Sequence, residues 1–197
     1  RKLLAGRASL VEAGYVEHRS LGIIRLSPEL TIPIELIYDS SLEKTGIFGF
    51  AWHSPQLESS ARWDKDGMLW TSPWGEKVKF FLNSVKTPKD AIKIEVIEEA
   101  KTGRGYYAPY SEWEADITSG NPRLSGNWII KGKKSLVGWA FSYTSGRLSK
   151  IVTPTGRYAD FLYDVKGRLL SVSQNGTDFI SLSYDGTLTK AATISGI

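Results

Sequence analysis

The stretch Phe161-Leu162-Tyr163-Asp164-Val165-Lys166-Gly167-Arg168-Leu169 decides the fold of this chain, because close copies of it recur about every twenty-one residues. The preceding copy is Phe141-Ser142-Tyr143-Thr144-Ser145-Gly146-Arg147-Leu148, and the following one fades into Leu182-Ser183-Tyr184-Asp185-Gly186-Thr187-Leu188. An earlier copy is Trp63-Asp64-Lys65-Asp66-Gly67-Met68-Leu69. Self-similarity at a fixed period predicts a stack of one supersecondary unit.

Each copy predicts a β-hairpin with one apolar face. Side chains alternate between the two faces of a strand, so Trp139, Phe141 and Tyr143 point the same way. The equivalent positions of the next copy and of the return strands are Ala159, Phe161, Tyr163, Ile151 and Val172. Such hairpins are marginal alone, so we expect them to stack into a curved, twisted, meandering sheet.

The turns of the repeat carry their own chemistry. The Asp164 carboxylate can accept from backbone N–H groups, and Gly167 can take the positive φ that closes the turn. A second signal, at Pro154-Thr155-Gly156 and at Trp74-Gly75, predicts another turn type at the opposite end of each hairpin. The motif residues expected to have a structural role are Trp63, Asp64, Gly67, Tyr143, Gly146, Arg147, Tyr163, Asp164, Gly167, Arg168 and Tyr184.

Composition favours an all-β fold with little or no helix. The chain has 197 residues with 19 glycines and 12% aromatics, and it contains no cysteine, which excludes disulfides and cysteine-ligated zinc. Its charges, 25 basic and 21 acidic, are interspersed, and the one basic run, Lys131-Gly132-Lys133-Lys134, is typical of a solvated turn. We therefore expect no nucleic-acid partner. No stretch approaches the roughly 20 apolar residues of a membrane span.

The sequence divides into a leading segment at 1–60, with its own strands, and the repeats at 61–197, interrupted by an insertion at about 101–127. Alternating residues predict strands at 30–38 and 92–96, and a helix is expected only near Lys2 to Glu12. The chain begins without Met and stops at Ile197 within strand-like sequence. We expect it to be a piece of something longer.

At Tyr163 to Leu169 the sequence resembles the signature of YD-repeat proteins, the Rhs (rearrangement hotspot) group that also includes insecticidal toxin-complex shells and teneurins. A second match lies upstream, where the residues from Pro33 to Ser41 and from Gly46 to Trp52 look like the strand and glycine–tryptophan lead-in of such arrays. The likeness covers roughly residues 8–82 and 136–190.

The resemblance implies a bacterial secreted or cell-surface protein in which β-hairpins spiral into a strip or shell around another polypeptide. Partners would be further repeats of the same parent chain or an encased protein, including a toxin. The sequence departs from the family in having few repeats and no self-cleaving aspartyl segment. The resulting expectation is a non-enzymatic structural module without cofactors.

Catalytic and metal-binding arrangements are poorly supported by the residue pattern. His18 and His53 lie far apart without a zinc-ligand spacing, and no nucleophile elbow accompanies His53. The Asp64-Lys65-Asp66-Gly67 stretch lacks the further ligands of a calcium loop. Glu112, Glu114 and Asp116 alternate onto one strand face, so a hydrolase using Glu112 or Asp116 is the third hypothesis, behind a solvated face.

Two aromatic clusters leave a binding function open. Trp52, Trp63, Trp70 and Trp74 fall in one short region, and we expect them mainly to fill the core. The insertion holds a second cluster, predicted as a ligand-binding set, made of Tyr106, Tyr107, Tyr110 and Trp113. The alternative hypothesis for the whole chain is therefore a carbohydrate-binding module of a bacterial surface protein.

Overall fold

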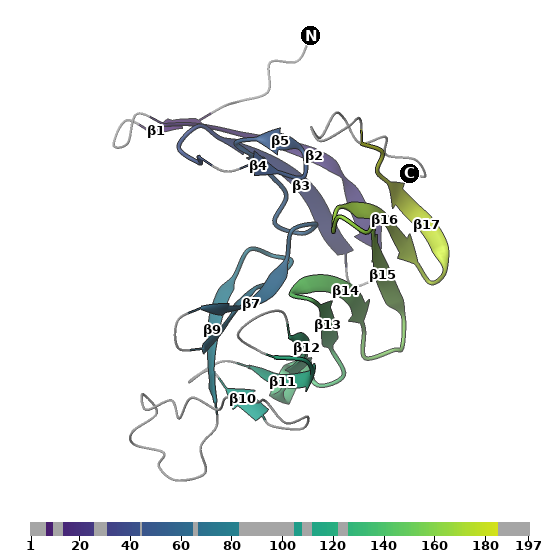
Figure 1. The fold of residues 1–197 in the computed structure, drawn as a ribbon. Helices are drawn as coiled ribbons and strands as arrows, with labels where there is room; N and C mark the ends of the chain where they lie inside the picture. The colour runs from purple at the N-terminus through teal and green to yellow at the C-terminus, as the bar shows by residue number, and fades with distance from the viewer. Residues whose placement is uncertain are drawn as a thin grey trace. The chain divides into compact units, whose positions relative to one another are not determined.

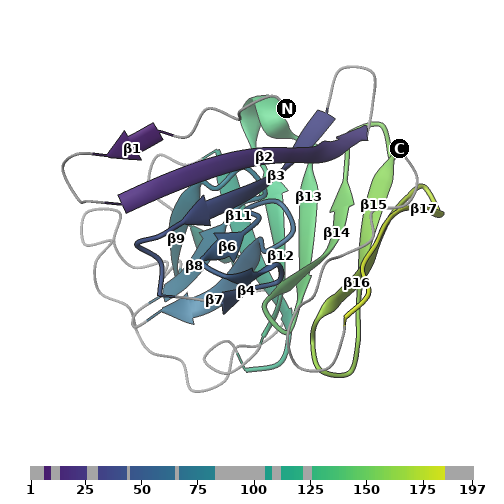
Figure 2. The same cartoon turned by 90° about the horizontal axis from the view of Figure 1, so that it is seen from above.

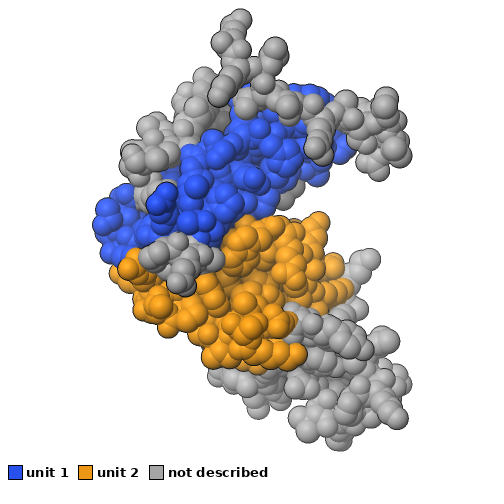
Figure 3. Space-filling view, turned by 180° about the vertical axis from the view of Figure 1, so that it is seen from behind, with its two compact units in different colours: residues 1–58, 161–197 blue, residues 59–160 orange. Residues whose placement is uncertain are grey.

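The computed structural model of the chain describes residues 7–9, 14–25, 31–43, 45–64, 67–82, 105–107, 112–121 and 126–184 (Figure 1). These residues form antiparallel strands, as the composition predicts, together with one short 3₁₀ turn, η1 (Lys134–Leu136), and no α-helix among them. The chain divides into two compact units, which Figure 3 colours separately. Unit 1 comprises residues 1–58 and 161–197, and unit 2 comprises residues 59–160.

Unit 1 contains a four-stranded sheet in the order β1-β2-β3-β6, in which β2 is the longest strand (Figure 2). These strands are β1 (Arg7–Ser9), β2 (Gly14–Arg25), β3 (Thr31–Asp39) and β6 (Trp52–His53). The strand expected at 30–38 is therefore confirmed as β3. The helix expected near Lys2 to Glu12 is wrong for Arg7–Ser9, because these residues pair with Gly14, Tyr15 and Val16 as strand β1.

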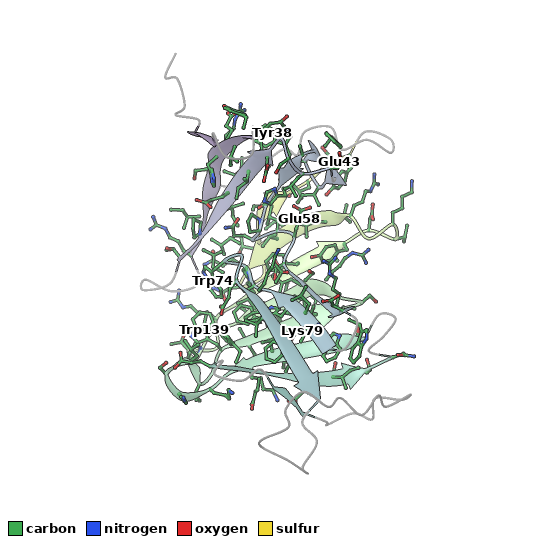
Figure 4. The ribbon with its side chains drawn as sticks, turned by 90° about the vertical axis from the view of Figure 1, so that its left-hand side faces the viewer. Tyr38, Glu43, Glu58, Trp74, Lys79 and Trp139 are labelled. Atoms are coloured by element: carbon green, nitrogen blue, oxygen red, sulfur yellow. The ribbon has the colours of Figure 1, made fainter. Side chains whose placement is uncertain are left out.

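The glycine–tryptophan segment of unit 1 is a small hairpin, β4 (Thr45–Gly46) and β5 (Gly49–Phe50). Glu58 fixes it, because its two carboxylate oxygens accept from the backbone N–H of Ile47 at 3.1 Å and of Ser54 at 2.7 Å (Figure 4). Only glycine fits at position 46 of this hairpin. A Cβ at this position would lie 2.1 Å from the carbonyl oxygen of Trp52.

Unit 2 is a ring of eight antiparallel strands. Each strand pairs with its neighbour in the chain from β7 to β14, and β14 returns to β7 through the pair Arg147–Ser60 and the bond from Ala61 N–H to Gly146 O at 3.0 Å. With one registered pair, the seam is the shortest of the described pairings in the ring. The strands are β7 (Ser60–Asp64), β8 (Gly67–Thr71), β9 (Lys77–Leu82), β10 (Gly105–Tyr107), β11 (Trp113–Ser119), β12 (Asn127–Gly132), β13 (Ala140–Thr144) and β14 (Arg147–Val152).

The core of unit 2 is built around aromatic rings. Phe141 is fully buried and meets the rings of four tryptophans at centroid distances between 5.4 and 6.2 Å. Such aromatic contacts add about 0.5–1.5 kcal/mol each beyond the area that they bury. The four tryptophans are Trp70, Trp74, Trp113 and Trp139.

The repeats form the meander that their sequence predicts. Strand β14 is followed by β15 (Tyr158–Tyr163), β16 (Leu169–Gln174) and β17 (Thr177–Ser181), each beside the one before it. Ile151 and Val172, one repeat apart, are both 0% exposed, which confirms that equivalent positions face inward. Phe141, Tyr143, Ala159 and Phe161 are buried as well.

The predicted insertion at 101–127 is not a loop where the structure describes it. Strands β10 and β11 lie within it, and both belong to the ring of unit 2. Along β11 the buried Trp113, Ala115 and Ile117 alternate with the more exposed Glu114 and Asp116. The strand expected at 92–96 lies outside the described residues.

Candidate functional site

The turns of the repeat are the most regular feature of the described chain. In residues 164–168, Asp164 O accepts from Gly167 N–H at 2.8 Å and Asp164 N–H donates to Arg168 O at 2.9 Å. The Asp164 carboxylate also accepts from the backbone N–H of Lys166 at 2.9 Å and of Arg168 at 2.8 Å. Gly167 has φ +75°, so both predicted roles, carboxylate acceptor and left-handed glycine, are confirmed.

The same hydrogen bonds recur where a different turn type was expected. At residues 153–157, Thr153 Oγ1 accepts from Arg157 N–H at 3.1 Å, and Gly156 has φ +78°. At residues 72–76, Ser72 Oγ accepts from Glu76 N–H at 3.0 Å, and Gly75 has φ +83°. The expectation that two turn types alternate at opposite hairpin ends is therefore wrong. Ser, Thr and Asp each offer an oxygen at the first position, so three sequences make one five-residue turn.

A second kind of turn closes the remaining described hairpins of the repeats. Ser145-Gly146 has φ values of +49° and +77°, and Asn175-Gly176 has +49° and +85°. Two successive left-handed residues define the two-residue turn that matches the twist of a hairpin. Gly67 belongs to neither group. Its φ is not left-handed, and it is a glycine because a Cβ would lie 2.5 Å from the carbonyl oxygen of Phe80 on β9.

Arg168 joins its own turn to the tyrosine of the following copy. Its Nε donates to Asp164 Oδ2 at 2.7 Å, and its guanidinium lies 4.6 Å from the centroid of the Tyr184 ring. The Tyr184 hydroxyl in turn donates to Leu169 O at 2.5 Å. This set, Asp164, Arg168, Leu169 and Tyr184, is called here the repeat latch, and it lies within unit 1.

The latch also shifts the pKa values of its ionisable groups. The Arg168 backbone N–H is the main cause of the lowered pKa of the Asp164 carboxyl, and the Arg168 side chain and the Lys166 N–H lower it further. Partial burial raises the pKa of the Tyr184 phenol, and the Arg168 charge opposes that effect. At neutral pH the latch therefore contains an ionised carboxylate and a protonated phenol, which are the forms its hydrogen bonds need.

The other motif residues occupy strands or turns of the two units. Tyr143 is 1% exposed in unit 2 and Tyr163 is half-buried in unit 1, while Arg147 is exposed at the seam. Trp63 is half-buried, and Asp64 lies 3.4 Å from the Lys79 ammonium.

The predicted ligand-binding cluster is not assembled as a surface by the described residues. Trp113 is 8% exposed, and its ring packs on Trp70 at 5.2 Å and on Phe141 at 5.4 Å. Tyr106 and Tyr107 form part of strand β10, of whose side chains nothing is described, and Tyr110 lies outside the described residues. Trp113 is thus a core residue. In the sequence, Trp113 is followed at every second position by the apolar residues Ala115 and Ile117, and this alternation was the signal for burial.

The carboxylates considered for hydrolysis take part in surface contacts instead. Asp116 Oδ2 lies 3.1 Å from the Lys131 ammonium, and Glu112 accepts from the Ser135 hydroxyl at 3.4 Å. Glu114 is exposed. No cluster of three or more His, Cys, Asp or Glu suited to a metal occurs among the residues that the structure describes, and Asp66 of the calcium-like stretch lies outside them.

Sequence reasoning missed one polar and aromatic cluster on the sheet of unit 1. Tyr15, Tyr38 and Trp52 lie ring to ring, and Arg19 and Glu17 lie beside them. The alternation of Tyr15, Glu17 and Arg19 along one strand was the available signal. Two further tryptophans of the same sequence region, Trp70 and Trp74, belong to unit 2, where Trp70 is 0% exposed and Trp74 is 41% exposed.

No protein-family model matches the chain, and no curated protein matches it at a significant level. The likeness to the YD-repeat group therefore depends on the motif residues themselves. Within the part of the chain that the structure describes, no helix is long and apolar enough to cross a membrane.

Proposed function

We propose that this chain is a non-enzymatic structural module of a secreted or cell-surface bacterial protein of the Rhs/YD-repeat type. In this proposal, successive hairpins extend a sheet that encases, presents or docks another polypeptide. The occupant of the growing edge is a further repeat of the same parent protein. The encased polypeptide, in the family that the motif resembles, can be a toxin.

The observation that carries the proposal is the free edge of β17. In the strand order of the repeat sheet β17 comes last, so its outer edge has no pairing strand among the described residues. A free edge presents backbone N–H and C=O groups that another strand can use. Strands β15 and β16 of the same sheet show what such a strand would look like, because each buries a residue at the core position of the copy before it, Phe161 after Phe141 and Val172 after Ile151.

The repeat latch supports the same proposal. Tyr184 reaches back to the carbonyl of Leu169 and covers Arg168, so this copy contributes a tyrosine to the turn of the copy before it. In repeat proteins, stability is close to a sum of intrinsic repeat terms and nearest-neighbour interface terms. A latch between consecutive copies is an interface term of this kind.

The decisive experiment inserts a second copy of residues 164–184 directly after Tyr184. We expect the added copy to fold onto β17, which raises the urea midpoint and slows amide hydrogen exchange along Thr177–Ser181. The matched control carries Gly167→Val and Asp164→Ala in the inserted copy only, so that length and most of the composition are kept while the turn is lost.

Two outcomes contradict the proposal. The first is an inserted copy that leaves both the midpoint and the exchange of β17 unchanged. The second is an inserted copy and a control that stabilise the chain equally, since then the repeat turn would not direct the addition.

A further inference from the structure

An aromatic row crosses three strands of the unit 1 sheet. Tyr15 of β2, Tyr38 of β3 and Trp52 of β6 are its members, with ring centroids 6.1 Å apart for the first pair and 5.1 Å apart for the second. The planes are tilted by 50° and 55°, so the rings overlap only partly (Tyr38 is labelled in Figure 4). Tyr38 and Trp52 are half-buried and Tyr15 is exposed, so part of the row is open to another molecule.

The register of the sheet explains why these rings share one face. Glu17 is directly opposite Tyr38, and Tyr38 is directly opposite Trp52. Further along β3, the same face carries Ile32 and Ile34, which are 1% and 0% exposed. The face is thus part of the core at one end and reaches solvent at the other, where Tyr15 is 42% exposed.

Arg19 is held in a fixed orientation above this row. Its Nε donates to Glu17 Oε1 at 2.7 Å, and its guanidinium carbon lies 5.2 Å from the centroid of the Trp52 ring. Half of the Arg19 side chain remains exposed. Among the residues that the structure describes, its two terminal nitrogens have no hydrogen-bond partner, so they remain available as a planar pair of donors.

We propose that the aromatic row, together with Arg19 and Glu17, is a binding site for a neutral carbohydrate. A sugar ring has an apolar face of C–H groups and a rim of hydroxyls. Aromatic rings with large area and little conformational freedom suit the face, and a fixed pair of donors suits two adjacent hydroxyl oxygens. Glu17 supplies an acceptor beside them, because among the described residues its second oxygen contacts only the Tyr15 hydroxyl, at 3.4 Å.

The charges at the site favour an uncharged ligand. Glu17 and Arg19 form an ion pair, so their charges cancel, and an acidic sugar would meet the Glu17 carboxylate beside the arginine. The row crosses three strands, which suits an oligosaccharide of several residues better than one sugar. This binding function is independent of the hairpin addition at β17, because it uses a different sheet.

The test is isothermal titration of the full chain with soluble neutral hexasaccharides, one each of glucose, mannose, galactose and N-acetylglucosamine units. We expect at least one of them to bind, and Trp52→Ala and Arg19→Lys to weaken its affinity by about tenfold or more. Arg19→Lys keeps the charge but loses the planar donor pair. Trp52→Phe keeps a ring and should weaken binding less than Trp52→Ala.

Trp74→Ala is the matched control, because Trp74 is exposed as much as Tyr15 but lies in unit 2. It should leave the affinity unchanged. The mild surface variant Tyr15→Ala should weaken binding and guards against a Trp52 variant that fails to fold. The proposal is overturned if no neutral hexasaccharide binds, if only a uronate-containing one does, or if the variants of the row bind as tightly as the Trp74 control.

Discussion

At the scale of single residues, Tyr143 shows how the interior of unit 2 satisfies its polar atoms. The Trp70 indole N–H donates to the Tyr143 hydroxyl at 2.5 Å, and that hydroxyl lies 2.8 Å from Ser59 Oγ. Ser59 gives its own hydrogen to Thr71 O at 2.7 Å. The Tyr143 hydroxyl therefore donates the hydrogen bond to Ser59 Oγ and accepts the one from the Trp70 indole.

Replacing Tyr143 with Phe should lower the free energy of unfolding by about 1–3 kcal/mol, because the buried Trp70 N–H is left without its acceptor. Urea denaturation followed by tryptophan fluorescence measures the change. Tyr15→Phe is the control, since its hydroxyl is exposed and makes only a 3.4 Å contact. Equal effects of the two substitutions would contradict the network described here.

Asp164 should make stability depend on pH. Its folded-state pKa lies below the ordinary value of about 3.9, so its contribution is complete above that value and is lost as pH falls through the folded pKa. Asp164→Asn should therefore lower the urea midpoint at pH 7, and the difference from the unchanged chain should shrink toward pH 2.5. Asp160→Asn serves as control, because it removes a carboxylate whose one ion-pair partner in the described part of the chain is Lys150, at 3.3 Å. A difference that stays constant with pH would rule out the ionised carboxylate as the cause.

At the scale of elements, the turn at residues 164–168 could be predicted in full from the sequence, whereas the type of the turn at residues 153–157 was predicted wrongly. The roles of Asp164 and Gly167 follow from residue chemistry, and the structure has both. The turn at Thr153 has the same hydrogen bonds, but proline at the second position and threonine at the first hid the likeness. Gly67 stands where later copies have Gly167, but it is a glycine because of the nearby backbone of β9, which no local sequence pattern reveals.

A comparison of Gly146 with Gly156 distinguishes backbone strain from steric crowding. Gly146 and Gly156 have nearly equal φ values, +77° and +78°, but a Cβ on Gly146 would lie 3.0 Å from Ala61 O, and one on Gly156 would meet nothing within 4 Å. Gly156→Ala should cost about 1–2 kcal/mol, the strain of a left-handed alanine. Gly146→Ala should lower the free energy of unfolding by more, because its Cβ would also crowd the Ala61 carbonyl oxygen at the seam between β7 and β14. Chemical denaturation of both variants checks the order, and a smaller loss for Gly146→Ala would contradict the close approach.

At the scale of the whole molecule, the all-β class and the meander of the repeats could be predicted, and the ring could not. The sequence period indicates which residues face inward. It does not indicate that Ser60 pairs with Arg147 at the seam, because these two residues are far apart in the sequence. Strands β10 and β11 lie in a segment with Gly, Pro and Asn that reads locally as a loop. The aromatic row was missed for a similar reason, since its rings come from three separate strands.

Unit 2 should fold alone as residues 59–160, because it is continuous in sequence and its strands pair mainly among themselves. Six of the seven tryptophans lie in this range, so fluorescence of the full chain reports chiefly on it. We expect the excised unit to unfold cooperatively, near the fluorescence midpoint of the full chain. A broad, non-cooperative transition would show that the ring needs the remaining residues.

The short seam of the ring has a consequence for synthesis. Ser60 leaves the ribosome early, but its partner Arg147 follows only after most of unit 2 has been made. Until then β7 has a partner on one side only, and an unsatisfied strand is the usual starting point of aggregation. Contacts between segments so distant in sequence also form slowly. We therefore expect a chaperone, or slow synthesis at low temperature, to improve the yield of the protein by protecting β7 during translation.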